Sequence, residues 1–141
     1  MIKIVLDANV FVSAVIKSPS IPARILELIK EREVVLILSN EILSEIRNAL
    51  LYPRLQKLHR RSSDEIQNFL ENTAKISLMV PGKVKVQAIK DDPADNKYLS
   101  VALEGKADFI VSGDHHLKNL KTFQGIRILD PSTFLVLTTK A

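Results

Sequence analysis

The chain has 141 residues, of which 46% are hydrophobic and 26% charged, with no cysteine and a formal net charge of +4 at pH 7. This length fits one domain over residues 1–141, and the absence of cysteine excludes disulfides, thiolate nucleophiles and cysteine-ligated zinc sites. No apolar run reaches the roughly 18 residues that a membrane span needs, so we expect no membrane partner and a cytoplasmic location. The mild excess of positive charge is compatible with a nucleic-acid partner.

Short aliphatic runs alternate with amphipathic stretches along the chain. In chain order, the pattern predicts a strand at 2–6, a helix at 20–32, a strand at 34–38, a helix at 39–51, a loop or short helix at 52–63, a helix at 62–74, a strand at 76–80, a helix at 94–107, and strands at 109–111 and 126–129. The continuously apolar runs are typical of strands covered on both faces, as in a parallel sheet. The alternation predicts an α/β sandwich with a mostly parallel sheet.

Several predicted helices carry recognisable end signals. Ser39 is a natural N-cap for the helix that follows it. Ser62 and Glu65 have the spacing of a capping box, in which each side chain bonds the other's backbone N–H. Gly105 is typical of a helix stop.

Two acidic residues follow predicted strands. Asp7 comes directly after the run Ile4–Leu6, and Asp114 follows the run FIVSG in the same way. Ligands of open α/β sheets bind outside the carboxyl ends of the strands, so both carboxylates lie at one edge if both strands are parallel and central. Each acid also has an ordinary interpretation, Asp7 as a loop acid and Asp114 as the cap of a short helix.

Two further acids lie on predicted helices. Asp95 shares the core-facing stripe of the helix at 94–107, because apolar residues follow it at i+3, i+4 and i+7. An unpaired carboxylate in that position is costly. Glu45 lies at the border of the apolar face of the helix at 39–51, where it can lean over the sheet edge. The alternatives are a first-turn acid favoured by the helix dipole for Asp95, and a solvated border residue for Glu45.

Converging carboxylates repel one another and raise one another's pKa values, and a divalent cation resolves this conflict. Oxygen ligands without cysteine favour Mg²⁺ or Mn²⁺ over zinc. Magnesium held by a few carboxylates is common in chemistry on phosphates, where the metal activates water and stabilises charge that develops at phosphorus.

Three segments carry a family resemblance: IVLDANVFVSAVI, LSNEILSEIRNAL and DDPADNKYLSVALEGKADFIVSGDHHLKNL. They resemble the PIN domain and, more narrowly, the PIN-type toxin components of bacterial and archaeal toxin–antitoxin systems. The resemblance covers residues 4 to about 129. It implies a three-layer α/β/α sandwich and a ribonuclease that depends on Mg²⁺ or Mn²⁺. It also implies a homodimer and, for a toxin, a small cognate antitoxin that covers the acidic pocket.

The acidic positions of the family, which imply catalytic and metal-binding roles, fall on Asp7, Glu45, Asp95 and Asp114. Asp92 matches the first acid of the D-P-x-D-N signature, where we expect either a helix cap, given the proline after it, or an acid that supports the metal ligands. Asn9 and Ser112 match polar positions near the acids, where we expect them to orient a ligand or water. Where relatives often carry another acid after the last one, this chain has His115 and His116, which we expect at the surface of a helix start.

An acidic pocket repels RNA unless basic residues surround it, and with the four site acids set aside the remaining side chains are distinctly basic. The candidates for contacts with RNA phosphates are Arg47, Arg54, Lys57, Arg60 and Arg61. Each of these residues taken alone is equally typical of a solvated face. The RNA-binding interpretation predicts salt-sensitive binding.

The predicted function is hydrolysis of RNA phosphodiester bonds by metal-activated water, with a 5′ phosphate on the product. The alternative is a non-catalytic RNA- or protein-binding module on the same scaffold, against which the intact acid set argues. A haloacid-dehalogenase-like phosphatase also begins with a strand and an aspartate. That class requires D-x-D after the strand, and here Asn9 replaces the second acid.

Overall fold

The structure is a computed structural model that describes residues 1–86 and 95–139. Within them, six strands form one sheet in the order β3-β2-β1-β4-β6-β5. The strands are β1 (Ile2–Leu6), β2 (Val34–Leu38), β3 (Leu78–Met79), β4 (Phe109–Val111), β5 (Thr122–Phe123) and β6 (Ile126–Leu129). The helices are α1 (Ala8–Ile16), α2 (Ile21–Lys30), α3 (Asn40–Leu51), α4 (Pro53–His59), α5 (Ser63–Lys75), α6 (Asn96–Gly105), α7 (His115–Leu120) and α8 (Pro131–Thr139).

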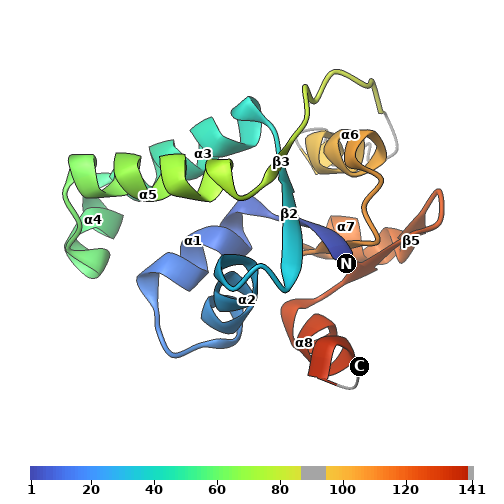
Figure 1. Ribbon diagram of the computed structural model, residues 1–141, viewed down its shortest axis with the longest axis horizontal. Helices are drawn as coiled ribbons and strands as arrows, with labels where there is room; N and C mark the ends of the chain where they lie inside the picture. The colour runs from blue at the N-terminus through green and yellow to red at the C-terminus, as the bar shows by residue number, and fades with distance from the viewer. Residues whose placement is uncertain (87–94, 140–141) are drawn as a thin grey trace.

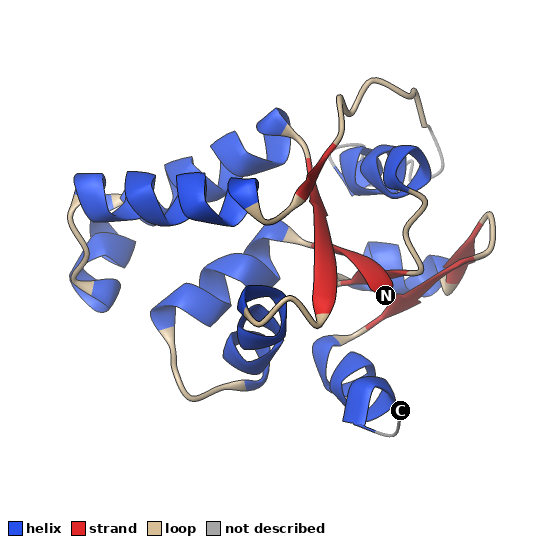
Figure 2. Cartoon of the chain, viewed as in Figure 1, coloured by secondary structure: helices blue, strands red, loops and turns tan. Residues whose placement is uncertain are grey.

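The sheet is parallel except for its last pair, in which β5 runs antiparallel to β6. From β1 the chain continues to β2, which lies toward one edge of the sheet. From β4 it continues to β5 and β6, which lie toward the opposite edge. Right-handed crossovers therefore put the connecting helices on opposite faces. Helices α1 and α2 lie on one side of the sheet and α6 and α7 on the other (Figure 1). The predicted three-layer α/β/α sandwich with a mostly parallel sheet is confirmed (Figure 2).

Helix α6 packs closely on the centre of the sheet. Tyr98, Leu99 and Ala102 are all buried, as the predicted core-facing stripe requires. At the end of α6, a Cβ on Gly105 would lie 2.6 Å from Cγ2 of Ile37 on β2. The absence of a side chain at Gly105 therefore lets the helix approach the strand this closely.

The predicted helix ends are confirmed where hydrogen bonds define them. The Ser39 hydroxyl accepts from the backbone N–H of Ile42 at 3.2 Å and caps α3. Ser62 and Glu65 form both bonds of the capping box of α5. Helix α6 ends at Gly105 as predicted, but the left-handed cap residue is Lys106, with φ 54°, and not the glycine. The stretch expected to be a loop or a short helix contains α4. No helix in the described ranges is both long enough and apolar enough to cross a membrane.

Four elements differ from the sequence-based expectation, and one of them is the unpredicted two-residue strand β5. The strand predicted at 76–80 is only the two residues of β3, because Ile76 is the C-cap of α5 and its backbone N–H bonds the end of that helix. Helix α1 is not predicted because ANVFVSAVI is apolar nearly throughout, and only Asn9 and Ser13, four residues apart, mark its exposed face. Helix α8 is missed because PSTFLVLTT shows almost no separation of apolar and polar faces.

Candidate active site

The first two predicted acids lie where two central strands end. Strands β1 and β4 are parallel neighbours, with Leu6 opposite Val111 in the ladder. The backbone N–H of Asp7 extends this ladder by donating to the carbonyl of Val111 at 3.0 Å. Because the chain leaves β1 and β4 in opposite directions, this edge is the topological switch point, where open α/β sheets leave a crevice for ligands.

Asp7 is held in place by two hydrogen bonds. It is buried, with 4% of the residue exposed, and it is the N-cap of α1. Its Oδ1 accepts from the backbone N–H of Asn9 at 3.0 Å. Its Oδ2 accepts from the hydroxyl of Ser112 at 2.7 Å. An ionised carboxylate offers about four lone-pair sites, so two donors leave room for a further ligand.

Asp114 is tied to the same hydroxyl from the other side. Its backbone N–H donates to Oγ of the fully buried Ser112 at 2.9 Å. The carboxylate Oδ1 caps α7 by accepting from the backbone N–H groups of His116 at 2.8 Å and Leu117 at 3.3 Å. The cap interpretation of Asp114 is therefore confirmed, and it leaves Oδ2 available for a ligand. His115 is exposed at the start of α7, as expected, and its ring centroid lies 4.0 Å from that of His116.

Asp7 and Asp114 line one pocket. The pocket has a volume of about 370 Å³. Its lining residues are Asp7, Asn9, Val10, Ser13, Pro22, Gly113, Asp114 and Pro131. Asn9 thus lies beside the acids, as predicted, whereas Ser112 lies beneath them and joins them. Two carboxylates on one partly enclosed surface favour a cation.

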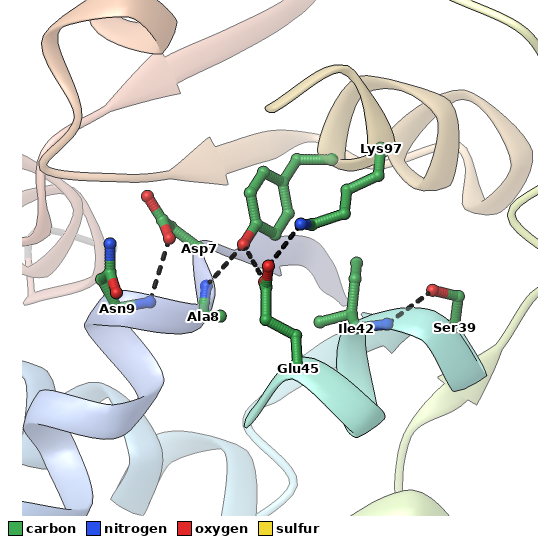
Figure 3. Close-up of polar contacts among 8 residues, drawn as sticks. Asp7, Ala8, Asn9, Ser39, Ile42, Glu45 and Lys97 are labelled. Carbon is green, nitrogen blue, oxygen red and sulfur yellow. Dashed lines mark hydrogen bonds and ion pairs between the residues drawn. The ribbon is translucent and has the colours of Figure 1, made fainter. Parts of the chain in front are cut away.

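Glu45 occupies a different set of contacts, shown in Figure 3. Its Oε1 accepts from the Tyr98 hydroxyl at 2.5 Å, and its Oε2 pairs with the Lys97 ammonium. The Tyr98 oxygen also accepts from the backbone N–H of Ala8 at 3.1 Å, next to Asp7. Glu45 does reach across from α3 to the sheet edge, as its border position on the helix predicts.

The roles of Lys97 and Tyr98 are not predicted from the sequence, in which Tyr98 is one more apolar member of the stripe on α6. A signal was present, because a tyrosine in the middle of a buried stripe needs a partner for its hydroxyl. Two partners are found, and burial followed by the hydrogen bond to Glu45 raises the pKa of Tyr98 well above its ordinary value. The phenol therefore stays protonated and remains a donor at neutral pH.

We expect Tyr98→Phe to lower the free energy of unfolding by about 1–3 kcal/mol at pH 8, because a buried backbone N–H and a carboxylate lose their partner. Because folding raises the Tyr98 pKa, the contribution of the hydroxyl is complete below the ordinary tyrosine pKa of about 10 and is lost as pH rises above it. Urea unfolding at pH 8 and above pH 10 checks this, and the two proteins should converge at the higher pH. A constant difference would contradict it.

The remaining predicted acids are only partly placed. Asp95 is half-buried and is the N-cap of α6, whereas Asp92 lies outside the described residues. Within residues 1–86 and 95–139, no group of three or more histidine, aspartate or glutamate side chains is placed to hold one ion. The structure brings Asp7 and Asp114 together, and a metal site of four acids stays a prediction.

The predicted RNA-binding residues do not line the pocket of Asp7 and Asp114. Arg47 lines a separate pocket of about 240 Å³ between α3 and α5. Arg54 and Lys57 belong to α4, which lies at the end of α3 and α5 far from the sheet (Figure 1). Arg60 is the C-cap of α4, and the Arg61 guanidinium lies 5.6 Å from the ring centroid of Phe69. Arg54, Lys57, Arg60 and Arg61 therefore lie at the outer end of a helical hairpin, whereas Arg47 lies along it between α3 and α5.

Comparison with known proteins identifies the family. A family model described as a PIN domain matches residues 3–116, so the extent of the domain to residue 141 stays a prediction. An uncharacterized protein of Methanocaldococcus jannaschii is 37% identical over 120 residues, which are 85% of this chain and 76% of that protein. The match to the family model includes both strands of the switch point and the acids that follow them. The chain belongs to the PIN domain family.

Proposed function

We propose that this protein is a metal-dependent endoribonuclease whose reaction centre is the pocket of Asp7 and Asp114. PIN domains are generally nucleases that use divalent metals. The observation that carries the proposal is that the two acids follow neighbouring parallel strands, share the Ser112 hydroxyl and line one pocket. Both carboxylates also cap helices, and their caps leave further lone pairs for a ligand in the pocket.

The donor set fits Mg²⁺ or Mn²⁺. Magnesium usually keeps several waters and is bound by one or two carboxylates together with substrate phosphates. Asp7 and Asp114 supply that number of carboxylates, and their fixed orientation suits a hard cation. When bound, the metal would activate water for attack on a phosphodiester and offset negative charge at phosphorus. Asp95 is proposed as an outer acid of the same centre, whereas Glu45, already paired with Lys97, lies beside it.

Hydrogen bonds from neighbouring groups orient the two acids of this pocket. The Asn9 N–H and the Ser112 hydroxyl fix both oxygens of Asp7, so the carboxylate meets a ligand without rotating. Ser112 also holds the backbone of Asp114, which couples the positions of the two acids. The Asn9 side chain, on the pocket wall, is proposed to orient water or a phosphate oxygen.

A non-catalytic RNA- or protein-binding module is the second candidate. The observation that favours it is that Glu45 already has a cation, Lys97, and that no three acidic or histidine side chains gather around one point in the described residues. Such a module would bind RNA through basic residues at the end of α3 and α5 and would leave it intact.

Incubation of an end-labelled, mixed-sequence single-stranded RNA with Mn²⁺ or Mg²⁺ separates the two candidates. A nuclease cuts the RNA in either metal, leaves 5′ phosphates, and stops when EDTA is added. DNA of the same sequence tests the preference for RNA. Salt-sensitive binding without cutting, across several RNAs and both metals, would replace the nuclease by the binding module.

We expect Ser112→Ala to weaken Mn²⁺ binding by about 10- to 100-fold, the usual cost of losing a group that orients a metal ligand. The hydroxyl holds Oδ2 of Asp7 and the backbone of Asp114, so its loss releases both acids. Ser13→Ala is a matched control, because Ser13 lines the same pocket. Electron paramagnetic resonance of free Mn²⁺ measures the affinity, and equal affinities for the two variants would contradict the positioning role of Ser112.

The resemblance supports further proposals about partners. We propose that the protein is the toxin of a toxin–antitoxin pair, that its antitoxin covers the acidic pocket, and that it forms a homodimer. We also propose that Arg47, Arg54, Lys57, Arg60 and Arg61 contact RNA phosphates. Neutralising any one of the five should weaken RNA binding and reduce its salt dependence by a similar small step.

A further inference from the structure

We propose that Lys97 is an internal counter-cation for Glu45, so that the divalent ion binds through Asp7 and Asp114 while Lys97 withholds the third acid from it. The inference rests on the proposed function in one respect, that a divalent ion binds at Asp7 and Asp114. It adds that this chain sets the number of its metal ligands with a lysine, and that removing the lysine frees one more carboxylate.

The pair between Lys97 and Glu45 is unlike the surface ion pairs of the molecule. The Lys97 side chain is only 17% exposed and that of Glu45 is 37% exposed. By contrast, Arg24 and its partners Glu27 and Glu31 are each about half exposed. Partial burial of the lysine weakens screening by water and salt, so the pair is held more firmly than an exposed one. The ammonium also lies 5.2 Å from the ring centroid of Tyr98, within range of a cation–π contact.

Both oxygens of Glu45 are engaged. Lys97 pairs with Oε2, while the Tyr98 hydroxyl donates its single hydrogen to Oε1 at 2.5 Å. The contact of Tyr98 with Ala8 does not compete for this hydrogen, because there the hydroxyl oxygen accepts from the backbone N–H of Ala8. Lys97 and Tyr98 are consecutive residues at the start of α6, so one helix turn delivers both donors to one carboxylate.

The place of this network explains why a counter-cation is needed. Ala8, which donates to Tyr98, directly follows Asp7, so one tyrosine hydroxyl separates the environment of Glu45 from that of Asp7. Three carboxylates in one region repel one another when no cation is present. Lys97 neutralises one of them and leaves the other two for the metal. Glu45 is then a positioning residue for Tyr98 and Lys97 rather than a metal ligand in the native protein.

Mn²⁺ affinity measured on a double-mutant cycle tests the proposal. The cycle contains the native protein, Lys97→Met, Glu45→Gln and the double variant, with Lys75→Met as a control that removes an exposed lysine from α5. We expect Lys97→Met to bind Mn²⁺ on the order of tenfold more tightly, because a nearby positive charge is removed and a carboxylate is freed. We expect Glu45→Gln alone to weaken binding several-fold, because the unpaired Lys97 ammonium then repels the ion, and the double variant to return to within about twofold of the native affinity.

Three results would overturn the proposal. The double variant could bind far more weakly than the native protein, which would make Glu45 a metal ligand in the native protein. Lys97→Met could bind no more tightly than Lys75→Met. The gain could also persist in the double variant, which would make it a pure charge effect without Glu45.

Metal-free melting provides a second measurement. In EDTA, Lys97→Met should melt below Lys75→Met, because Glu45 loses its counter-ion, and Mn²⁺ should raise its melting temperature by more than it raises that of the native protein. An equal rise in both would contradict the proposal. If Lys97→Met does not fold, Lys97→Gln removes the charge, keeps a donor and carries the same expectation.

The failure of this proposal is distinguishable from that of the proposed function. If the native protein binds Mn²⁺ but cuts no RNA, the nuclease assignment fails while the four affinities still decide the role of Lys97. If the native protein binds no Mn²⁺ at all, both fail. If RNA is cut and the cycle shows no coupling between positions 45 and 97, only the proposed role of Lys97 as a counter-cation is overturned.

Discussion

Asp7→Asn is expected to lower the metal-dependent cleavage rate by about 100-fold or more, the scale that follows when one preoriented electrostatic group is removed from a reaction centre. Asparagine has nearly the same shape and keeps an oxygen that can cap α1, but it lacks the charge that attracts a cation. The fold should therefore survive while the metal site does not. Initial rates at saturating Mn²⁺ on end-labelled RNA give the comparison.

The matched control for Asp7→Asn is Asp64→Asn, which removes an exposed aspartate from the first turn of α5. This control should cut RNA at the native rate. Circular dichroism of both variants shows whether they are folded. Cleavage by folded Asp7→Asn at the native rate would place the reaction elsewhere or assign it to a contaminating nuclease.

Phe11→Ala is expected to lower the free energy of unfolding by about 3–5 kcal/mol, the usual cost of emptying a fully buried aromatic site. Phe11 is fully buried on α1, and its ring centroid lies 5.9 Å from that of Phe69 on α5. Its loss removes contacts between two helices of one layer and leaves a cavity beneath the helix that Asp7 caps. Urea unfolding followed by circular dichroism measures the change.

Leu58→Ala is the control for this prediction, because Leu58 is 61% exposed on α4. Surface substitutions of this kind usually change stability by no more than about 0.5 kcal/mol. A loss in Phe11→Ala no larger than that of the control would show that the contact between α1 and α5 contributes little. We also expect weaker Mn²⁺ binding in Phe11→Ala, since α1 orients the carboxylate at its N-cap.

The fold was predictable wherever a pattern had a physical period. The apolar strands β1 and β2 follow from continuous runs, and α3 and α5 follow from one apolar face and a side-chain cap. Helix α1 was not predictable in this way. Six of its nine residues are buried, and its solvent face is marked only by Asn9 and Ser13, which are too few polar residues to establish a helical period. Its β-branched valines also favour a strand when they are taken without tertiary context.

The candidate site was predictable in part, for a topological reason. An acid directly after a buried strand is placed by the strand, so Asp7 and Asp114 could be brought together before the sheet was known. Contacts between helices depend on packing angles that a sequence does not specify. The pair of Lys97 with Glu45 joins α6 to α3 across 52 positions of sequence, and neither residue alone indicates the other. The basic residues around α4 were grouped by composition, and the structure places them away from the acids.

The pairing of Lys97 with Glu45 changes what the set of four acids means. If all four bound metal directly, the metal-free protein would hold several unbalanced charges at one sheet edge. The structure shows one of them balanced by a lysine, and two others fixed by backbone N–H groups and a shared hydroxyl. For the proposed metal site, this arrangement would hold the acids in place before an ion binds, which is the preorganisation that electrostatic catalysis requires.

Mn²⁺ binding to the native protein, Asp7→Asn and Asp114→Asn, measured by electron paramagnetic resonance without RNA, tests the central claim most directly. This measurement does not depend on finding the right RNA. If Asp7 and Asp114 form one metal site, the native protein binds Mn²⁺ and both folded variants lose that binding. Binding that survives unchanged in either variant would contradict a metal centre made by these two carboxylates.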